Sequence, residues 1–252
     1  MSHRAPVDHP IHDHLRDRCS LYDFDPDRMV TVECPACSRH AVIFDIDDTL
    51  LHSMADDDRL YREAIVAVAG PVEFRASLAD YEHVSDSGIL REVLRDNRIE
   101  ETVGLVDAVR QHFLRSLTSF VSRNGPFREV DGARELLARL GRSKTHAVGL
   151  ATGSWRPSAE LKLATAGFDV DGLPLATSDD APERTAIMRH ALAALGDSSE
   201  SVTYYGDGVW DRRACEGLGW RFRPVGPALD GIPGFRDEFP ESDVRRGTGN
   251  RR

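Results

Sequence analysis

Short apolar runs recur along the second half of the chain, and a similar run stands near its start. They cover residues 41–44, 147–151, 173–177, 201–205 and 220–225. Runs of this length bounded by turn residues are typical of strands buried in a parallel sheet. Stretches with the apolar spacing of helices lie between the later runs, over 132–140, 157–166, 183–195 and 212–217. The pattern therefore predicts an α/β protein with a doubly wound parallel sheet and right-handed crossovers.

Residues 52–125 interrupt this alternation. Their apolar side chains recur with a period near that of the α-helix, in stripes such as Leu60–Ala64–Ile65–Val68, until the breaker at 124–126. An all-helical insert is the simplest interpretation. The expected organisation is an α/β core over 41–51 and 126–235, a helical cap over 52–125, an irregular leader over 1–40 and a disordered tail over 236–252.

Composition narrows the possible partners. The formal net charge of -10 argues against nucleic acid, because a phosphate backbone needs clustered positive charge. No apolar run approaches the length of a membrane span, and no signal peptide is recognisable. Without a secretory signal, the four cysteines do not indicate a disulfide framework. A cytoplasmic protein is expected, and the oligomeric state stays open.

The leader carries one possible metal motif. Cys34 and Cys37 form a CxxC pair, which is half of many structural Zn²⁺ sites. Such a site needs four ligands, and no second CxxC is present, although Cys19 or His40 could add one. The alternative is a pair of thiols with no metal. A zinc-dependent docking role for the leader therefore remains a hypothesis.

The first apolar run ends in an acidic cluster. Asp45, Asp47 and Asp48 follow it directly, with the hydroxyl of Thr49 beside them. Carboxylates crowded at a strand end repel one another, and a bound divalent cation would offset that repulsion. Oxygen ligands of this kind suit Mg²⁺. The alternative is a solvated acidic loop.

Other polar residues follow the later runs. Thr152 and Gly153 come after the second, Arg184 begins the helix after the third, and Asp207 and Asp211 follow the fourth. In a parallel sheet these ends share one edge, where open α/β sheets bind their ligands. This combination favours phosphoryl transfer. The carboxylates can hold a metal, while the hydroxyl, the backbone amides and the guanidinium can hold the phosphoryl oxygens.

These motifs resemble those of the haloacid dehalogenase superfamily. Residues 45–49 match its DxDxT pattern, the strand that ends at Thr152 matches its second motif, and residues 206–211 match GDxxxD. The resemblance covers about 41–226 and is greatest to the capped phosphatases and mutases similar to phosphoglycolate phosphatase and β-phosphoglucomutase. It implies a Rossmann-like core with an inserted all-helical cap that closes over the site.

The resemblance also implies roles. Asp45 is expected to attack phosphorus and form an aspartyl-phosphate, and Asp47 to act as general acid and base. Mg²⁺ is expected at Asp45, Asp47 (through its backbone carbonyl), Asp207 and Asp211. Thr152, Gly153 and Arg184 are expected to hold the phosphoryl group. The third motif is usually a lysine; neither Lys144 nor Lys162 stands in the expected place, so Arg184 is the candidate.

The expected substrate is a small phosphorylated metabolite. The acid at position 47 argues against a dehalogenase, and the absence of lysine from 52–125 argues against the phosphonate-cleaving branch. The alternatives are a phosphomutase of the β-phosphoglucomutase type and a non-catalytic phosphate-binding regulatory protein. Cap arginines could bind a second anionic group or form a solvated face: Arg91, Arg95, Arg98, Arg110 and Arg115.

Overall fold

The structure is a computed structural model that describes residues 39–196 and 199–239. Cys34, Cys37 and nearly all of the expected leader lie outside the described residues, as does most of the expected tail. The zinc prediction therefore stays a prediction.

The core is a five-stranded parallel sheet, as the apolar runs predict. Its strands are β1 (Arg39–Phe44), β2 (His146–Ala151), β3 (Leu175–Ala176), β4 (Ser199–Gly206) and β5 (Arg221–Pro224), in the order β3-β2-β1-β4-β5. The central strand β1 pairs with β2 and β4, and its residues 41–44 are fully buried. A strand covered on both faces needs apolar side chains at every position, which explains its unbroken apolar run.

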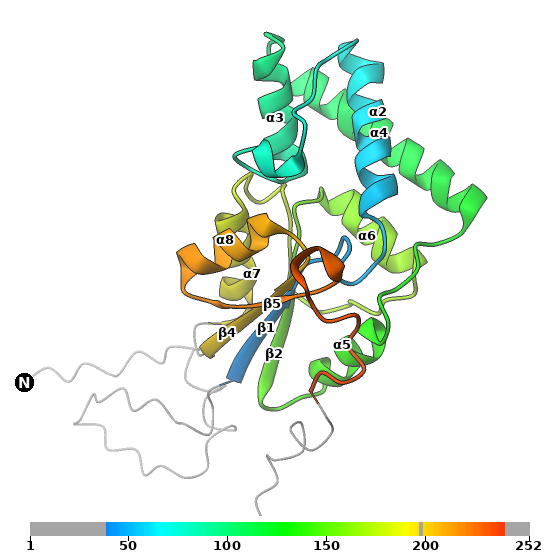
Figure 1. Cartoon of the computed structure of the whole chain (residues 1–252). Helices are drawn as coiled ribbons and strands as arrows, with labels where there is room; N and C mark the ends of the chain where they lie inside the picture. The colour runs from blue at the N-terminus through cyan, green and yellow to red at the C-terminus, as the bar shows by residue number, and fades with distance from the viewer. Residues whose placement is uncertain (1–38, 197–198, 240–252) are drawn as a thin grey trace, which may run out of the picture.

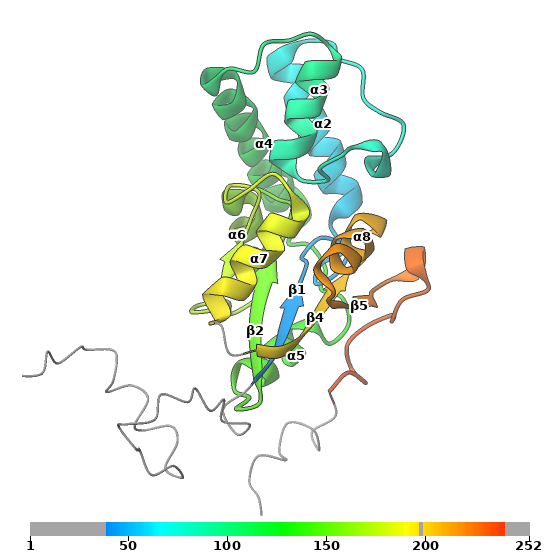
Figure 2. The ribbon, with the colours of Figure 1, turned by 90° about the vertical axis from the view of Figure 1, so that its left-hand side faces the viewer.

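Helices cover both faces of this sheet (Figure 2). Side chains alternate along β1, so Val42 and Phe44 join the apolar cluster with α5 (Ala133–Gly141) and α6 (Arg156–Thr165). Ile43 joins the opposite cluster with α7 (Arg184–Leu195) and α8 (Val209–Leu218). The doubly wound α/β fold predicted from the sequence is confirmed.

The insert over 52–125 contains mainly helices, and we use the name cap for these residues. It comprises α2 (Met54–Ala69), the 3₁₀ turn η1 (Leu78–Asp80), α3 (Asp86–Asp96) and α4 (Val103–Asn124), which lie beyond the carboxyl ends of the strands (Figure 1). The rings of Tyr61 on α2 and Phe113 on α4 lie 5.6 Å apart, and each also contacts Trp155 of the core. Trp155 is buried, so it packs beneath the cap.

The core extends past its expected boundary at residue 235. The Glu238 carboxylate accepts hydrogen bonds from the Tyr205 hydroxyl, at 2.6 Å, and from the Arg223 guanidinium. Phe239 packs against the apolar cluster. These contacts hold residues 236–239, which the charge of the sequence alone would assign to the tail.

Among the helices of residues 39–196 and 199–239, none combines the length and the apolar composition that a membrane span requires.

Candidate active site

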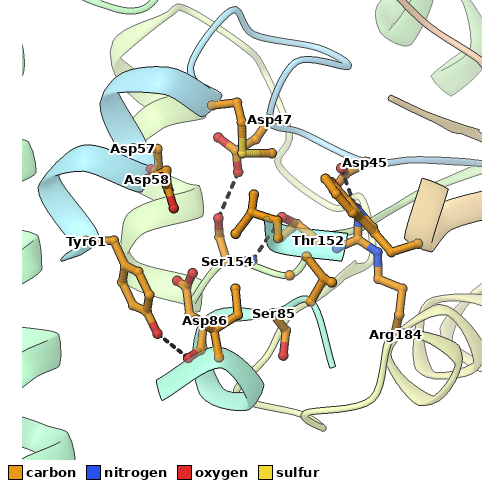
Figure 3. A pocket seen from close by; sticks show the side chains of 16 residues that line it. Asp45, Asp47, Asp57, Asp58, Tyr61, Ser85, Asp86, Thr152, Ser154 and Arg184 are labelled. Atoms are coloured by element: carbon orange, nitrogen blue, oxygen red, sulfur yellow. Dashed lines mark hydrogen bonds and ion pairs between the residues drawn. The ribbon is translucent and has the colours of Figure 1, made fainter. Parts of the chain in front are cut away.

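The ends of β1 and β2 and the start of α7 place several of the expected polar residues around one pocket. A cavity of about 60 Å³ is lined by Asp45, Asp47, Thr152, Gly153 and Arg184, together with side chains of the cap (Figure 3). After β1 the chain turns sharply, since the amides of residues 49, 50 and 51 all donate to the Ile46 carbonyl. Asp45 precedes this turn, and Asp47 lies within it.

Three carboxylates form the first of two charged clusters. One oxygen from each of Asp45, Asp207 and Asp211 lies within 4.8 Å of the other two. Asp45 Oδ1 and Asp207 Oδ1 are buried and have no hydrogen-bond partner among the described residues. We call Asp45, Asp207, Asp211 and Arg184 the metal-side cluster.

Burial and mutual repulsion make these carboxyls hard to ionise. Burial raises the pKa of Asp207 to about 9, with further contributions from Asp45 and Asp211. Burial also raises the pKa of Asp45 to about 7, although the nearby Arg184 opposes the shift. Hard oxygen ligands and unmet negative charge are what Mg²⁺ requires, so these residues fit that ion. The Asp47 carboxylate lies outside this cluster, which leaves only its backbone carbonyl as a candidate ligand.

Arg184 reaches the metal-side cluster from the start of α7. Its Nη2 atom lies 2.9 Å from Asp45 Oδ2 and 2.6 Å from Asp211 Oδ1, and the side chain is buried. Burial would lower the pKa of this guanidinium, but Asp211 and Asp45 raise it well above its usual value. The site therefore holds a permanent cation beside Asp45.

Gly153 lies against the same guanidinium. A Cβ atom at this position would come within 2.8 Å of Arg184 Nη1 and 2.9 Å of the Val84 carbonyl oxygen. Only glycine leaves room for the loop after β2 between Arg184 and the cap. The structure thus brings Thr152, Gly153 and Arg184 together, as the sequence predicts.

A second charged cluster surrounds Asp47, and sequence reasoning missed its central residue. Lys162 Nζ lies 2.6 and 2.8 Å from the two Asp47 oxygens and 2.7 Å from Asp57 Oδ1. We call Asp47, Asp57 and Lys162 the cap-side cluster. One signal could have revealed it: Lys162 shares the apolar face of α6 with Ala159 and Leu163, where a charged side chain needs a buried partner.

The Lys162 ammonium shifts the pKa values of the neighbouring carboxyl groups. Burial alone would raise the pKa of Asp47, but the Lys162 ammonium and hydrogen bonds from Lys162, Ser53 and Ser154 outweigh burial and lower it. Burial raises the pKa of Asp57 to about 6 despite the same ammonium. Asp47 is therefore held as an anion in this structure.

The start of α3 docks on the loop that follows β2. The Asp86 amide donates to the Gly153 carbonyl at 2.7 Å, and Asp86 Oδ2 accepts from the Trp155 amide at 2.8 Å. The Ser85 hydroxyl donates to the Pro182 carbonyl at 2.7 Å. These bonds seat the cap directly on the pocket, which explains the small cavity.

The cap arginines do not line this cavity. Arg91 pairs with Glu101 at 3.3 Å, Arg95 with Glu92 at 3.6 Å, and Arg110 with Asp179. Arg115 lines a different pocket, formed by residues of α2 and α4. The cap instead presents Asp57, Asp58 and Asp86 to the pocket, so a role for its arginines in binding a second anionic group has no support.

Comparisons with known proteins agree with this fold. A family model for haloacid dehalogenase-like hydrolases matches residues 40–219. A search of curated proteins gave no match. Among solved structures, β-phosphoglucomutase from Clostridium difficile superposes with a TM-score of 0.62 at 14% identity, covering 82% of this chain and 98% of that one.

Two other solved structures are similar in fold. CbbY from Rhodobacter sphaeroides, in complex with phosphate, has a TM-score of 0.58 at 19% identity, with 80% of this chain and 90% of that chain covered. A putative phosphoglycolate phosphatase from Lactobacillus plantarum has a TM-score of 0.52 at 18% identity, with 74% and 86% covered. At these identities the likeness shows the fold alone.

Proposed function

The chain belongs to the haloacid dehalogenase-like hydrolase family, and we propose that it is a Mg²⁺-dependent phosphatase acting on a small phosphorylated metabolite. One observation carries the proposal. The buried Asp45 carboxylate has Arg184 at 2.9 Å from one oxygen, and its other oxygen has no hydrogen-bond partner among the described residues. A carboxylate with a cation beside one oxygen and no partner on the other suits nucleophilic attack on phosphorus, and bound Mg²⁺ would favour its ionised form.

In the first step, an Asp45 oxygen bonds to phosphorus while the bond from phosphorus to the leaving oxygen breaks. Arg184, the Thr152 hydroxyl and the Gly153 amide hold the phosphoryl oxygens in line for this transfer. A proton from Asp47 goes to the leaving oxygen and releases an alcohol. For this step Asp47 must take up a proton when substrate binds, because it is an anion in the free protein.

In the second step, water attacks the phosphorus of the aspartyl-phosphate. Asp47 accepts the proton of that water, the bond between phosphorus and Asp45 breaks, and inorganic phosphate leaves. Bound Mg²⁺ would be held by Asp45, Asp207 and the Asp47 carbonyl, with Asp211 beside them, and would supply positive charge to the phosphoryl oxygens. The seated cap would keep bulk water from the reacting groups.

A screen against phosphorylated metabolites with Mg²⁺, scoring free phosphate, tests this function. Release by the wild type but not by Asp45→Asn supports a phosphatase. An isomerised sugar phosphate without net phosphate release would indicate the mutase alternative, which uses the same residues. Phosphate binding without any turnover would indicate the regulatory alternative. The cytoplasmic location expected from the sequence stays a prediction.

A further inference from the structure

Lys162 is a fully buried cation that contacts the pocket residue Asp47. It stands in the middle of α6, on the helix face that packs against the sheet and the cap. It does not line the cavity, so it cannot touch the substrate in this arrangement. The other lysine of the chain, Lys144, is exposed and lies in the turn before β2.

The Lys162 ammonium is fully engaged. It contacts both oxygens of Asp47, Asp57 Oδ1, and the Ser154 hydroxyl at 3.1 Å. An ammonium has three N–H donors, and three different side chains take them here. These partners come from three parts of the chain: the turn after β1, the first turn of cap helix α2, and the loop after β2.

Asp47 is held from several directions as a result. Oδ1 accepts from the Ser53 hydroxyl at 2.5 Å and Oδ2 from the Ser154 hydroxyl at 2.8 Å, while Lys162 bridges both oxygens. A carboxylate with every oxygen engaged keeps one rotamer. Proton transfer depends strongly on such placement, because a shift of about 1 Å can cost about 10²-fold in rate.

A purely structural ion pair is the competing explanation. Buried ion pairs contribute little to stability, and well-packed apolar replacements are often neutral or stabilising. In that case Lys162 would only neutralise the buried charge of Asp57 and would have no role in the reaction. The geometry argues otherwise, since the bridge ends on the one carboxylate of the pocket that the proposed mechanism uses for proton transfer.

Resting on the proposed function, we propose that Lys162 is a positioning residue that holds the Asp47 carboxylate for proton transfer. Through Asp57, the same ammonium ties that carboxylate to cap helix α2. The general acid is then correctly placed only while α2 is seated on the core.

The experiment compares two esters of similar shape, para-nitrophenyl phosphate and phenyl phosphate, with Mg²⁺ present. Phenol is the more basic leaving group, so its release depends more on a proton from Asp47. We expect Lys162→Met to lose at least about tenfold more kcat on phenyl phosphate than on the nitrophenyl ester, a fraction of the 10²- to 10⁴-fold that a general acid supplies. Asp47→Asn should show the same selectivity. The double variant Lys162→Met with Asp47→Asn should lose no more activity than Asp47→Asn alone.

Lys144→Met is the matched control, because it removes the other lysine from an exposed position. It should behave as the wild type on both esters. Equal losses of Lys162→Met on the two esters, or additive losses in the double variant, would overturn the positioning role while a selective Asp47→Asn leaves the phosphatase proposal standing. If Asp47→Asn is not selective, the acid role fails, and the inference about Lys162 fails with it.

A second variant covers the case in which Lys162→Met does not fold. Lys162→Met with Asp57→Asn leaves Asp47 as the only charge of the cap-side cluster, so less repulsion opposes folding. We expect it to keep the selective loss on phenyl phosphate. Wild-type rates on both esters would show that Lys162 only neutralises Asp57, and would overturn the inference.

Discussion

The carboxyl groups of the two charged clusters differ in how many cations and hydrogen-bond partners surround them. In the metal-side cluster, three carboxylates share the single cation Arg184, and two buried carboxylate oxygens lack a partner among the described residues. In the cap-side cluster, two carboxylates share Lys162, and both Asp47 oxygens are hydrogen-bonded. The first cluster has carboxyl oxygens without a partner among the described residues, whereas both oxygens of Asp47 in the second are hydrogen-bonded.

This difference assigns metal binding and proton transfer, the two tasks of the proposed mechanism, to different clusters. Carboxyl oxygens without partners favour binding of Mg²⁺, because the ion supplies the positive charge that they lack, and that charge would in turn attract the phosphoryl group. The bonds to Asp47 fix the position of its carboxyl group before the substrate arrives, which orients it for proton transfer once it has taken up a proton.

Asp45→Asn should have the largest effect. The substitution keeps the shape of the side chain but removes the nucleophilic oxygen, so kcat should fall by at least about 10⁴-fold. Steady-state phosphate release measures this. Asp169→Asn, at an exposed position, is the control, and comparable activity of the two variants would contradict the role of Asp45.

Arg184→Ala should come second. It removes the only cation of the metal-side cluster, and loss of one preorganised donor to a developing charge costs about 10²- to 10³-fold in kcat. Arg184→Lys should recover part of the rate, since an ammonium can meet fewer oxygens than a guanidinium. An unchanged rate in Arg184→Ala would mean that another group holds the phosphoryl oxygens.

Chelation should stop turnover and change how stability depends on pH. In metal-free protein the pKa of Asp207 is about 9, above its unfolded value of about 3.9, so the folded state binds more protons between these values. Stability therefore falls as pH rises across that window. Thermal unfolding in a chelator should show this fall, and Mg²⁺ should reduce it.

Asp207→Asn serves as the control for that measurement. Without a titrating carboxyl at this position, the metal-free variant should lose part of the pH dependence and respond less to Mg²⁺. Equal pH dependence in the variant and the wild type would show that Asp207 is not the group responsible.

Arg91→Ala should have the smallest effect. Its ion pair with Glu101 is exposed on the cap, and such pairs contribute about 1 kcal/mol or less to stability. Neither kcat nor KM should change for any substrate of the screen. A KM that rises only for substrates with two anionic groups would restore a binding role for the cap arginines.

Much of this organisation follows from local sequence patterns. The apolar run over 41–44 predicts the central strand, because a strand buried on both faces tolerates few polar residues. The convergence of Asp45, Thr152 and Asp207 follows from the parallel sheet, which brings the carboxyl ends of its strands to one edge.

The remaining features depend on packing between distant elements. Lys162 meets Asp57 only because α6 and cap helix α2 come together, and nothing near either residue in the sequence encodes that contact. The helical spacing of the cap arginines fits a binding face equally well, and the acidic partners of Arg91 and Arg110 lie outside their own helices. Glu238 is held by Tyr205, a residue far from it in sequence.

The most direct test of the account is to find the phosphoryl group on the enzyme. Protein mixed with a substrate from the screen is quenched in acid within one turnover, treated with borohydride to reduce any acyl phosphate, and mapped by peptide mass spectrometry. We expect reduction at Asp45 alone, and none in Asp45→Asn. Modification of a different residue, or phosphate release with Asp45 never modified, would contradict it.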